Sequence, residues 1–226
     1  MDGIVPAVRF DDRTDAGRRL GRRLATMGLH DVIVLGIPRG GVPVAAQVAS
    51  LLHAPLDVII VRKLGMPSQP EVAMGAIAEG DVRIVDVPLV KSIHITDREF
   101  SRVELAERRT LHRRAEQLRA DRMPSRIAGR TALIVDDGIA TGSTAAAACA
   151  AARRLGAARV VVAAPVAGPR ALERLTGADS VVALAVPDDF EAVGSYYRSF
   201  EATTDAEVAR LLAAARRDEP ADGAVL

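Results

Sequence analysis

The stretch Ala132-Leu-Ile-Val-Asp-Asp-Gly-Ile-Ala-Thr-Gly-Ser-Thr144 decides the fold. Its first four residues form a short continuous apolar run, which is typical of a central parallel strand covered by helices on both faces. Asp136 and Asp137 follow at the carboxyl end of this strand, where open α/β sheets bind their ligands. Two neighbouring carboxylates at such a place can hold hydroxyl groups or a hydrated Mg²⁺ ion.

The second half of the stretch predicts a phosphate site. Residues 140–144 directly precede the alanine-rich segment 145–155, which has high helix propensity. Backbone N–H groups of such a turn, together with the positive end of the helix, form a site for phosphate. The loop ends without the lysine of a Walker A motif. As an alternative, the aspartates begin a turn and Thr144 caps the helix. We favour the site, because strand, acid pair, loop and helix follow in the right order.

This order of elements resembles the type I phosphoribosyltransferase family, whose hallmark is a hydrophobic strand, two acidic residues and a Thr/Gly/Ser loop. The resemblance implies a site for 5-phosphoribosyl-1-pyrophosphate (PRPP) with Mg²⁺. Asp136 and Asp137 would contact the ribose hydroxyls and hold the metal, directly or through water. Gly138 departs from the family pattern, since most members carry an apolar residue there. The residues that the resemblance assigns to the 5-phosphate are Ala140, Thr141, Gly142, Ser143 and Thr144.

Strands and helices alternate along the chain, which predicts an α/β fold with a doubly wound, mostly parallel sheet. We expect a single domain over residues 1–226, with a core at about 30–186 and a frayed tail at 218–226. The expected strands are 32–35, 56–61, 132–135, 159–164 and 181–186. The expected helices are 15–27, 42–52, 143–155 and 169–175.

An insertion is expected at about 76–122, consisting of a hairpin at 76–85 and a long charged helix at 97–122. Thr96 and Glu99 form a plausible capping box at the start of this helix. Its many arginines are interleaved with glutamates, which favours helical ion pairs over a one-sign stripe for nucleic acid. We therefore expect a helix that faces solvent or another subunit, and no nucleic-acid partner.

Unusual residues also follow the first two strands. Arg39-Gly40-Gly41 offers a cation and bare backbone amides, and it resembles the pyrophosphate loop of bacterial xanthine and guanine phosphoribosyltransferases. Arg62 and Lys63 are predicted to follow the second strand, where two buried cations would be costly without an anion. They resemble the Arg-Lys pair of adenine and orotate phosphoribosyltransferases. The alternative interpretation of Arg39-Gly40-Gly41 is a glycine turn between strand and helix, and that of Arg62 and Lys63 is a solvated turn.

Residues 65–75 combine Gly, Pro and polar residues without periodicity, which indicates a mobile lid. In the resembled family a flexible loop here closes over the reaction centre and excludes water. The residues that we assign to the lid are Gly65, Ser68, Gln69 and Glu71.

The segment 187–200, which we call the hood, holds both tyrosines and half of the phenylalanines of an aromatic-poor chain. It is similar to the hood of 6-oxopurine phosphoribosyltransferases, which implies that Phe190 stacks on a base and that Asp188 contacts it. We expect the N-terminal segment to join the hood. The alternative is a satellite hydrophobic cluster. The lysine with which those enzymes read the purine oxygen is replaced by Ala163-Ala-Pro165, so the sequence does not select a purine.

Composition narrows the possible partners and the cellular location of the protein. The chain has 226 residues, 49% of them hydrophobic, and a formal net charge of +1, so a general attraction to nucleic acid or to an anionic membrane is not expected. Cys149 is the only cysteine, and we place it in the helix after the phosphate loop. With no internal disulfide, no secretory signal pattern and no apolar run of membrane length, we expect a cytoplasmic protein.

The resemblance implies an enzyme that transfers the 5-phosphoribosyl group of Mg-PRPP to a nitrogen nucleophile, a nucleobase, and releases pyrophosphate. Arg39, Arg62 and Lys63 would stabilise the leaving group, while Asp136 and Asp137 face the sugar. Dimers are common in the family, so we expect a homodimer. A non-catalytic regulator that binds PRPP or a nucleotide is the alternative. Synthesis of PRPP from ATP ranks last, because no ATP-binding segment is evident.

Overall fold

A computed structural model describes residues 8–70, 72–119 and 124–217, and the expected tail at 218–226 lies outside them. The core is a parallel sheet of five strands. In spatial order the strands are β2 (Leu56–Val58), β1 (Val32–Gly36), β6 (Thr131–Val135), β7 (Arg159–Val166) and β8 (Ser180–Ala185). The prediction of a doubly wound, mostly parallel sheet is confirmed.

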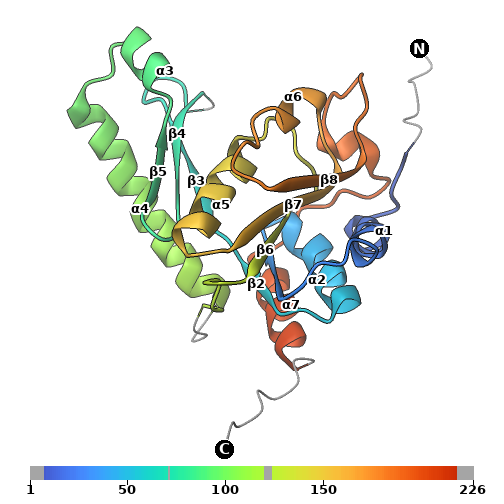
Figure 1. Ribbon diagram of the computed structural model, residues 1–226. Coiled ribbons are helices and arrows are strands. Elements are labelled where there is room, and N and C mark those ends of the chain that lie inside the picture. The colour runs from blue at the N-terminus through green and yellow to red at the C-terminus, as the bar shows by residue number, and fades with distance from the viewer. Residues whose placement is uncertain (1–7, 71, 120–123, 218–226) are drawn as a thin grey trace, which may run out of the picture.

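Helices cover both faces of this sheet (Figure 1). One face packs against α1 (Arg13–Ala25), α2 (Gly41–Leu52) and α7 (Asp205–Arg217), the other against α5 (Ser143–Arg154) and α6 (Pro169–Leu172). Val34 of β1 packs into the first layer, while its neighbours Ile33 and Leu35 pack into the second. Each fully buried aliphatic side chain of this kind contributes about 1.5–3 kcal/mol. Burial on both faces explains why the strands read as continuous apolar runs.

The insertion forms a second, antiparallel sheet that stands beside the core, with α5 between the two sheets (Figure 1). Its elements are β3 (Val61–Gly65), β4 (Ala73–Ala78), β5 (Val82–Val85), α3 (Val87–Ser92) and α4 (Asp97–Arg119). The capping box is confirmed, because Glu99 accepts from the backbone N–H of Thr96 at 3.0 Å and donates its own N–H to Thr96 Oγ1 at 3.3 Å. Helix α4 buries a stripe of Phe100, Leu111 and Leu118, so it is not simply solvated.

The far end of α4 is fixed by a buried ion cluster, formed by Asp57, Glu79 and Arg119. Arg119 donates from Nε to Asp57 Oδ1 at 3.0 Å and from Nη2 to the carbonyl of Val58 at 2.7 Å, and it pairs with Glu79. Burial alone would lower the pKa of Arg119, but hydrogen bonds to Glu79 and the charge of Asp57 raise it. The inserted helix is therefore bonded to the carboxyl end of β2.

Three sequence predictions need correction. The strand expected at 56–61 ends at Val58, and Val61 begins β3 in the other sheet. The irregular segment expected at 65–75 is shorter, because Gly65 ends β3 and Ala73 begins β4. The predicted hairpin is β4–β5, which starts three residues earlier than expected and gains β3 as a third strand.

Helices α3 and α7 had no counterpart in the sequence analysis, although Thr204 caps α7, and Val208 and Leu212 are buried at helical spacing behind this cap. The predicted helix 97–122 is described to Arg119, and its last residues lie outside the described ranges. In the described part of the chain no helix has both the length and the apolar character needed to cross a membrane.

Candidate functional site

The acid pair, Asp136 and Asp137, lies at the carboxyl end of β6, as the sequence predicts. Asp136 Oδ1 accepts the N–H of Asp137 at 2.9 Å, and Asp137 Oδ2 accepts Nε and Nη2 of Arg13, each at 2.8 Å. Within the described residues, Asp136 Oδ2 and Asp137 Oδ1 accept from no N–H group, and the two carboxyl groups lie within hydrogen-bonding reach of each other. Two carboxylate oxygens are thus free for a ligand.

Burial makes both carboxyl groups of the pair costly to ionise. It raises the pKa of Asp136 well above its usual value, and the neighbouring charge of Asp137 raises it further. Burial also raises the pKa of Asp137, while the guanidinium of Arg13 opposes this shift. A ligand that brings positive charge or hydroxyl donors would lower this cost.

Residues 140–142 lie in the turn between β6 and α5, and Ser143 and Thr144 begin α5. Gly142 has a positive φ of 77°, and a Cβ there would lie 2.6 Å from the carbonyl oxygen of Ala171, so only glycine fits. Thr141 is exposed, and its hydroxyl lies 3.4 Å from that of Ser143. No side chain of the described residues caps the start of α5, so its first N–H groups remain available.

The predicted pyrophosphate loop lies against the acid pair. The Pro38–Arg39 peptide bond is cis, and Arg39 is exposed in the turn between β1 and α2. A Cβ on Gly40 would come within 2.0 Å of Asp137 Oδ2, and one on Gly41 within 2.6 Å of the carbonyl oxygen of Val135. Glycine at both positions therefore allows the two loops to touch.

The helices that begin at this edge of the sheet differ from the other long helices in how their first turn is capped. Among the described helices longer than two turns, α2 and α5 begin without a side-chain cap. In the others a side chain accepts from the first turn: Asp12 in α1, Thr96 in α4 and Thr204 in α7. Of these two helices, α5 leaves its first N–H groups open at the predicted ligand edge. In α2 the N–H groups of Gly41 and Val42 bond to the carbonyls of Ile37 and Arg39, and Pro43 has no N–H. Open N–H groups at a helix start form an anion site.

Arg62 and Lys63 follow β2 along the chain, but they do not lie in a turn, the alternative interpretation, because they form part of another strand. Both lie within β3, where successive side chains point to opposite faces of the sheet. Arg62 is half-buried and pairs with Glu107 of α4 at 2.7 Å, whereas Lys63 is exposed. The two cations therefore do not lie side by side, and their role in pyrophosphate binding stays a prediction.

Arg114 of α4 is a cation that the sequence analysis missed. It follows Glu107 by seven residues, so both lie on the protein-facing side of the helix. Its Nη2 is 3.5 Å from Asp205, and its buried Nε has no partner among the described residues. Burial lowers the pKa of Arg114, Asp205 raises it, and the charges of Arg39 and Arg62 lower it again. Arg62 and Arg114 are paired with Glu107 and Asp205, so these three arginines and two acids carry one excess positive charge, which favours an anion.

The predicted lid is a hairpin loop between β3 and β4. The N–H of Met66 bonds to the carbonyl of Val72 at 2.9 Å, so the loop ends are paired. Ser68 and Gln69 are exposed, and Glu71 lies outside the described residues. A role of this loop as a lid stays a prediction.

The hood approaches the acid pair from β8. Phe190 is half-buried and stacks on Tyr196, with ring centroids 5.8 Å apart and planes 10° apart, while Asp188 is exposed. A Cβ on Gly138 would lie 2.3 Å from Cγ1 of Val193, so the hood fills the space beside this residue. This packing explains why Gly138 departs from the family pattern. Contact of Phe190 or Asp188 with a base stays a prediction.

Other residues of the site were also missed. Arg13 pairs with Asp137 across 124 positions, and Tyr197 donates its hydroxyl to the carbonyl of Asp137 at 2.6 Å across 60 positions. Nothing local marks Arg13, because it is one arginine among several at the start of α1. The concentration of aromatic residues in the hood was a usable signal for Tyr197.

The donor set at the acid pair fits Mg²⁺ that keeps most of its waters or takes oxygens from a substrate. Mg²⁺ prefers oxygen ligands, and the pair offers two free carboxylate oxygens. In the described ranges no group of three or more His, Cys, Asp or Glu side chains could enclose a metal. The acid pair alone would therefore hold the ion loosely, together with its substrate.

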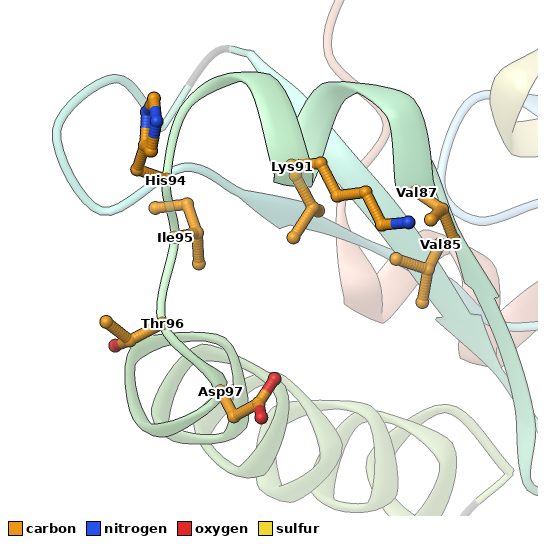
Figure 2. A pocket seen from close by; sticks show the side chains of 8 residues that line it. Val85, Val87, Lys91, His94, Ile95, Thr96 and Asp97 are labelled. Atoms are coloured by element: carbon orange, nitrogen blue, oxygen red, sulfur yellow. The ribbon is translucent and has the colours of Figure 1, made fainter.

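A surface groove of about 480 Å³ lies apart from this edge, between β5, α3 and the start of α4 (Figure 2). Lys91 extends along it toward Val85 and Val87, and His94 stands at its rim. None of the predicted site residues lines this groove. The candidate functional site is therefore the edge of the parallel sheet at the acid pair.

Comparisons with known proteins identify the family of the chain. The family model of the phosphoribosyl transferase domain matches residues 14–200. A Mycobacterium tuberculosis protein named as a phosphoribosyl transferase is 51% identical over 217 residues, which are 96% of this chain and 49% of that protein. A Thermus thermophilus protein of known crystal structure has 44% sequence identity to this chain and a TM-score of 0.79. The match covers 90% of this chain and 97% of the Thermus thermophilus chain.

This chain spans about half the length of the curated relatives that it matches. The family model, in contrast, covers both predicted phosphate-binding loops, the acid pair and the hood. The chain belongs to the phosphoribosyl transferase family.

Proposed function

We propose that the protein transfers the 5-phosphoribosyl group of Mg-PRPP to a ring nitrogen of a nucleobase and releases pyrophosphate. The observation that carries this proposal is the arrangement around the acid pair: the open start of α5 lies on one side of it, and the glycine loop with the exposed Arg39 lies on the other. PRPP has two phosphate-bearing ends on either side of a ribose with two hydroxyl groups. The site offers an anion position at each side and carboxylates between them.

Binding follows from this arrangement. The 5-phosphate lies at the start of α5 on the N–H groups of residues 142–144, and the ribose hydroxyls donate to Asp136 and Asp137. The pyrophosphate lies at the start of α2, with Arg39 beside it. Mg²⁺, held by the acid pair and the substrate, supplies positive charge that stabilises the leaving pyrophosphate.

The residues then act on the charge that develops in the reaction. The C1–O bond breaks, pyrophosphate leaves with the electron pair, and the lone pair of the base nitrogen forms the new bond to C1. The N–H bond of that nitrogen breaks, and its proton is released to water. Positive charge grows on the ribose, close to the carboxylates of the acid pair, while negative charge grows on the leaving group, close to Arg39, Arg62 and Arg114. The hood covers the base, with Phe190 as the stacking surface.

Mass spectrometry tests the proposal. The protein, Mg²⁺, PRPP and a mixed pool of purine and pyrimidine bases are incubated, and new ribonucleoside monophosphates are scored. The expected product disappears without Mg²⁺ and with Asp137→Asn, but persists with Asp31→Asn. Asp31 is a matched control because it pairs with Arg130 at 2.8 Å near the opposite end of β1. PRPP that binds without any base-dependent product would support the regulator instead.

A further inference from the structure

Arg13, the first residue of α1, approaches Asp137 with one edge of its guanidinium. Its Nε and Nη2 both lie 2.8 Å from Oδ2 of this carboxylate, and the two side chains are only 12% and 15% exposed. Both contacts go to a single oxygen, so Oδ1 of Asp137 accepts from no N–H group of the described residues. Arg13 therefore fixes which oxygen of Asp137 is offered to a ligand.

The other side of Arg13 is held by the segment that leaves the hood. Its Nη1 donates to the carbonyl of Glu201 at 2.6 Å, and its Cζ lies 3.9 Å from the centre of the Phe200 ring. A guanidinium bound at three of its atoms, with an aromatic ring beneath it, has little freedom to rotate. Its orientation is thus set by the hood as well as by α1.

The hood also binds the backbone of Asp137. Tyr197 donates its hydroxyl to the Asp137 carbonyl at 2.6 Å. Phe10 forms a β-bridge with Tyr197, accepts the N–H of Arg198 at 2.8 Å and donates to the carbonyl of Tyr196 at 2.8 Å. The N-terminal segment and the hood are therefore joined to each other and to both the side chain and the main chain of Asp137.

The pyrophosphate loop closes the remaining side. A Cβ on Gly40 would lie 2.0 Å from Asp137 Oδ2 and 3.2 Å from Nη2 of Arg13. The carboxylate is thus held between Arg13 and the backbone of Gly40, and it has no space to turn. This contact explains why the position next to Arg39 must be glycine.

We propose that Arg13 is a positioning residue for PRPP, which orients Asp137 so that Oδ1 meets the ribose, and which links this carboxylate to the hood. The inference rests on the proposed function. The family match covers residues 14–200, so both Arg13 and its partner Glu201 lie just outside it. Arg13 acts through Asp137 and does not itself contact the substrate.

Calorimetric titration with Mg-PRPP and steady-state kinetics test the role on the full chain. We expect Arg13→Gln to raise the Kd and the KM for PRPP about 10- to 100-fold, the usual effect of removing a partner that orients a ligand-binding group. Arg13→Lys keeps the charge and one contact, so it recovers part of the affinity. Arg19→Gln is the matched control and leaves both constants unchanged. Arg19 also pairs with an aspartate and lies over an aromatic ring, but that aspartate is Asp15 of its own helix.

A double-mutant cycle separates positioning from general damage to the fold. If Arg13 acts through Asp137, then Arg13→Gln has no further effect on PRPP affinity when Asp137 is already asparagine. Independent, multiplying losses in the two variants would overturn the proposal. If Arg13→Gln does not fold, the same cycle with Arg13→Lys decides the question.

The outcomes distinguish this inference from the function on which it rests. If the wild-type protein does not bind Mg-PRPP, both the proposed function and the role of Arg13 are wrong. A wild-type protein that binds Mg-PRPP, with Arg13→Gln binding equally well, removes only the role of Arg13. The proposal is supported by loss in Arg13→Gln, partial recovery in Arg13→Lys and absence of any further loss in the Asp137→Asn background.

Discussion

The acid pair and the buried ion cluster are built from the same kinds of side chain, yet they differ in how their oxygens are used. In the cluster, Asp57 accepts from Arg119, Val58 N–H and Ser125 N–H, and Glu79 accepts from Arg119 and Ile60 N–H. In the acid pair, two oxygens accept from no N–H group of the described residues. The cluster is saturated and holds the insertion in place, whereas the acid pair is left open for a ligand. Unsatisfied oxygens, more than the presence of charge, mark the functional site.

The comparison predicts that damage to the cluster reduces stability first. Arg119→Ala leaves Asp57 and Glu79 buried without their cation, which we expect to cost about 3–5 kcal/mol of unfolding free energy. Urea unfolding measures the loss. Arg108→Ala on the same helix removes a partly exposed pair with Glu104 at 2.8 Å, and its effect should stay within about 0.5 kcal/mol. Equal losses in the two variants would show that the cluster is not special.

A substitution in the acid pair should reduce activity more than stability. Asp137→Asn is expected to lower kcat/KM for PRPP about 10²- to 10³-fold, the usual loss for a group that stabilises the developing charge. Its unfolding free energy should fall less than that of Arg119→Ala, because the asparagine oxygen can still accept from Arg13 and because one of two adjacent buried charges is removed. Steady-state kinetics and urea unfolding on one preparation measure both quantities. Unchanged turnover would remove the acid pair from the mechanism.

The contact between hood and acid pair can be broken by size alone. Gly138→Ala places a Cβ 2.3 Å from Val193 Cγ1, and this overpacking should cost about 1–3 kcal/mol. Thermal unfolding measures the cost. The double variant Gly138→Ala/Val193→Ala makes room for the new methyl group and should recover most of the loss. Failure to recover would mean that glycine is needed for its backbone and not for space.

Arg114 belongs to the insertion, yet its pKa is lowered by the charge of Arg39 in the predicted pyrophosphate loop, so it tests whether the two regions act separately. Arg114→Gln should raise the Kd for inorganic pyrophosphate about 10- to 150-fold, since a charge-assisted hydrogen bond contributes about 1.5–3 kcal/mol. Arg113→Gln changes the exposed neighbour on α4 and should leave the Kd as it is. Equal binding by both variants would confine the insertion to a structural role.

The smallest expected effect concerns Cys149 of α5, the helix between the two sheets. Burial raises the pKa of its thiol to about 11, so below that pH the native thiol stays protonated. Because the unfolded thiol ionises earlier, its contribution to stability is complete at neutral pH and is lost as the pH rises through about 9 to 11. A thiol reagent at pH 8 should react only after urea is added. Rapid reaction of the native protein would mean that α5 opens.

Local patterns in the chain were enough for the parallel sheet, the loop at 140–144 and the glycines at 40 and 41. Each of these depends on residues close together in sequence. The sequence analysis erred where a strand changed partner, because the run 56–65 is apolar at first and nothing within it marks the passage from the core sheet to the second sheet. Arg62 and Lys63 were therefore expected as a pair just after the second strand, whereas β3 points them to opposite faces.

The sequence by itself determined the order of elements and the chemistry offered at the carboxyl ends of the strands. Only the tertiary structure decided which charges are satisfied. Arg13 reaches Asp137 across 124 positions and Arg119 reaches Asp57 across 62, and no local pattern relates the members of either pair. Secondary structure is encoded by neighbours along the chain, but hydrogen-bond partners are selected by packing in space. For this reason an acid at a strand end could be recognised from the sequence, while its freedom to bind a ligand could not.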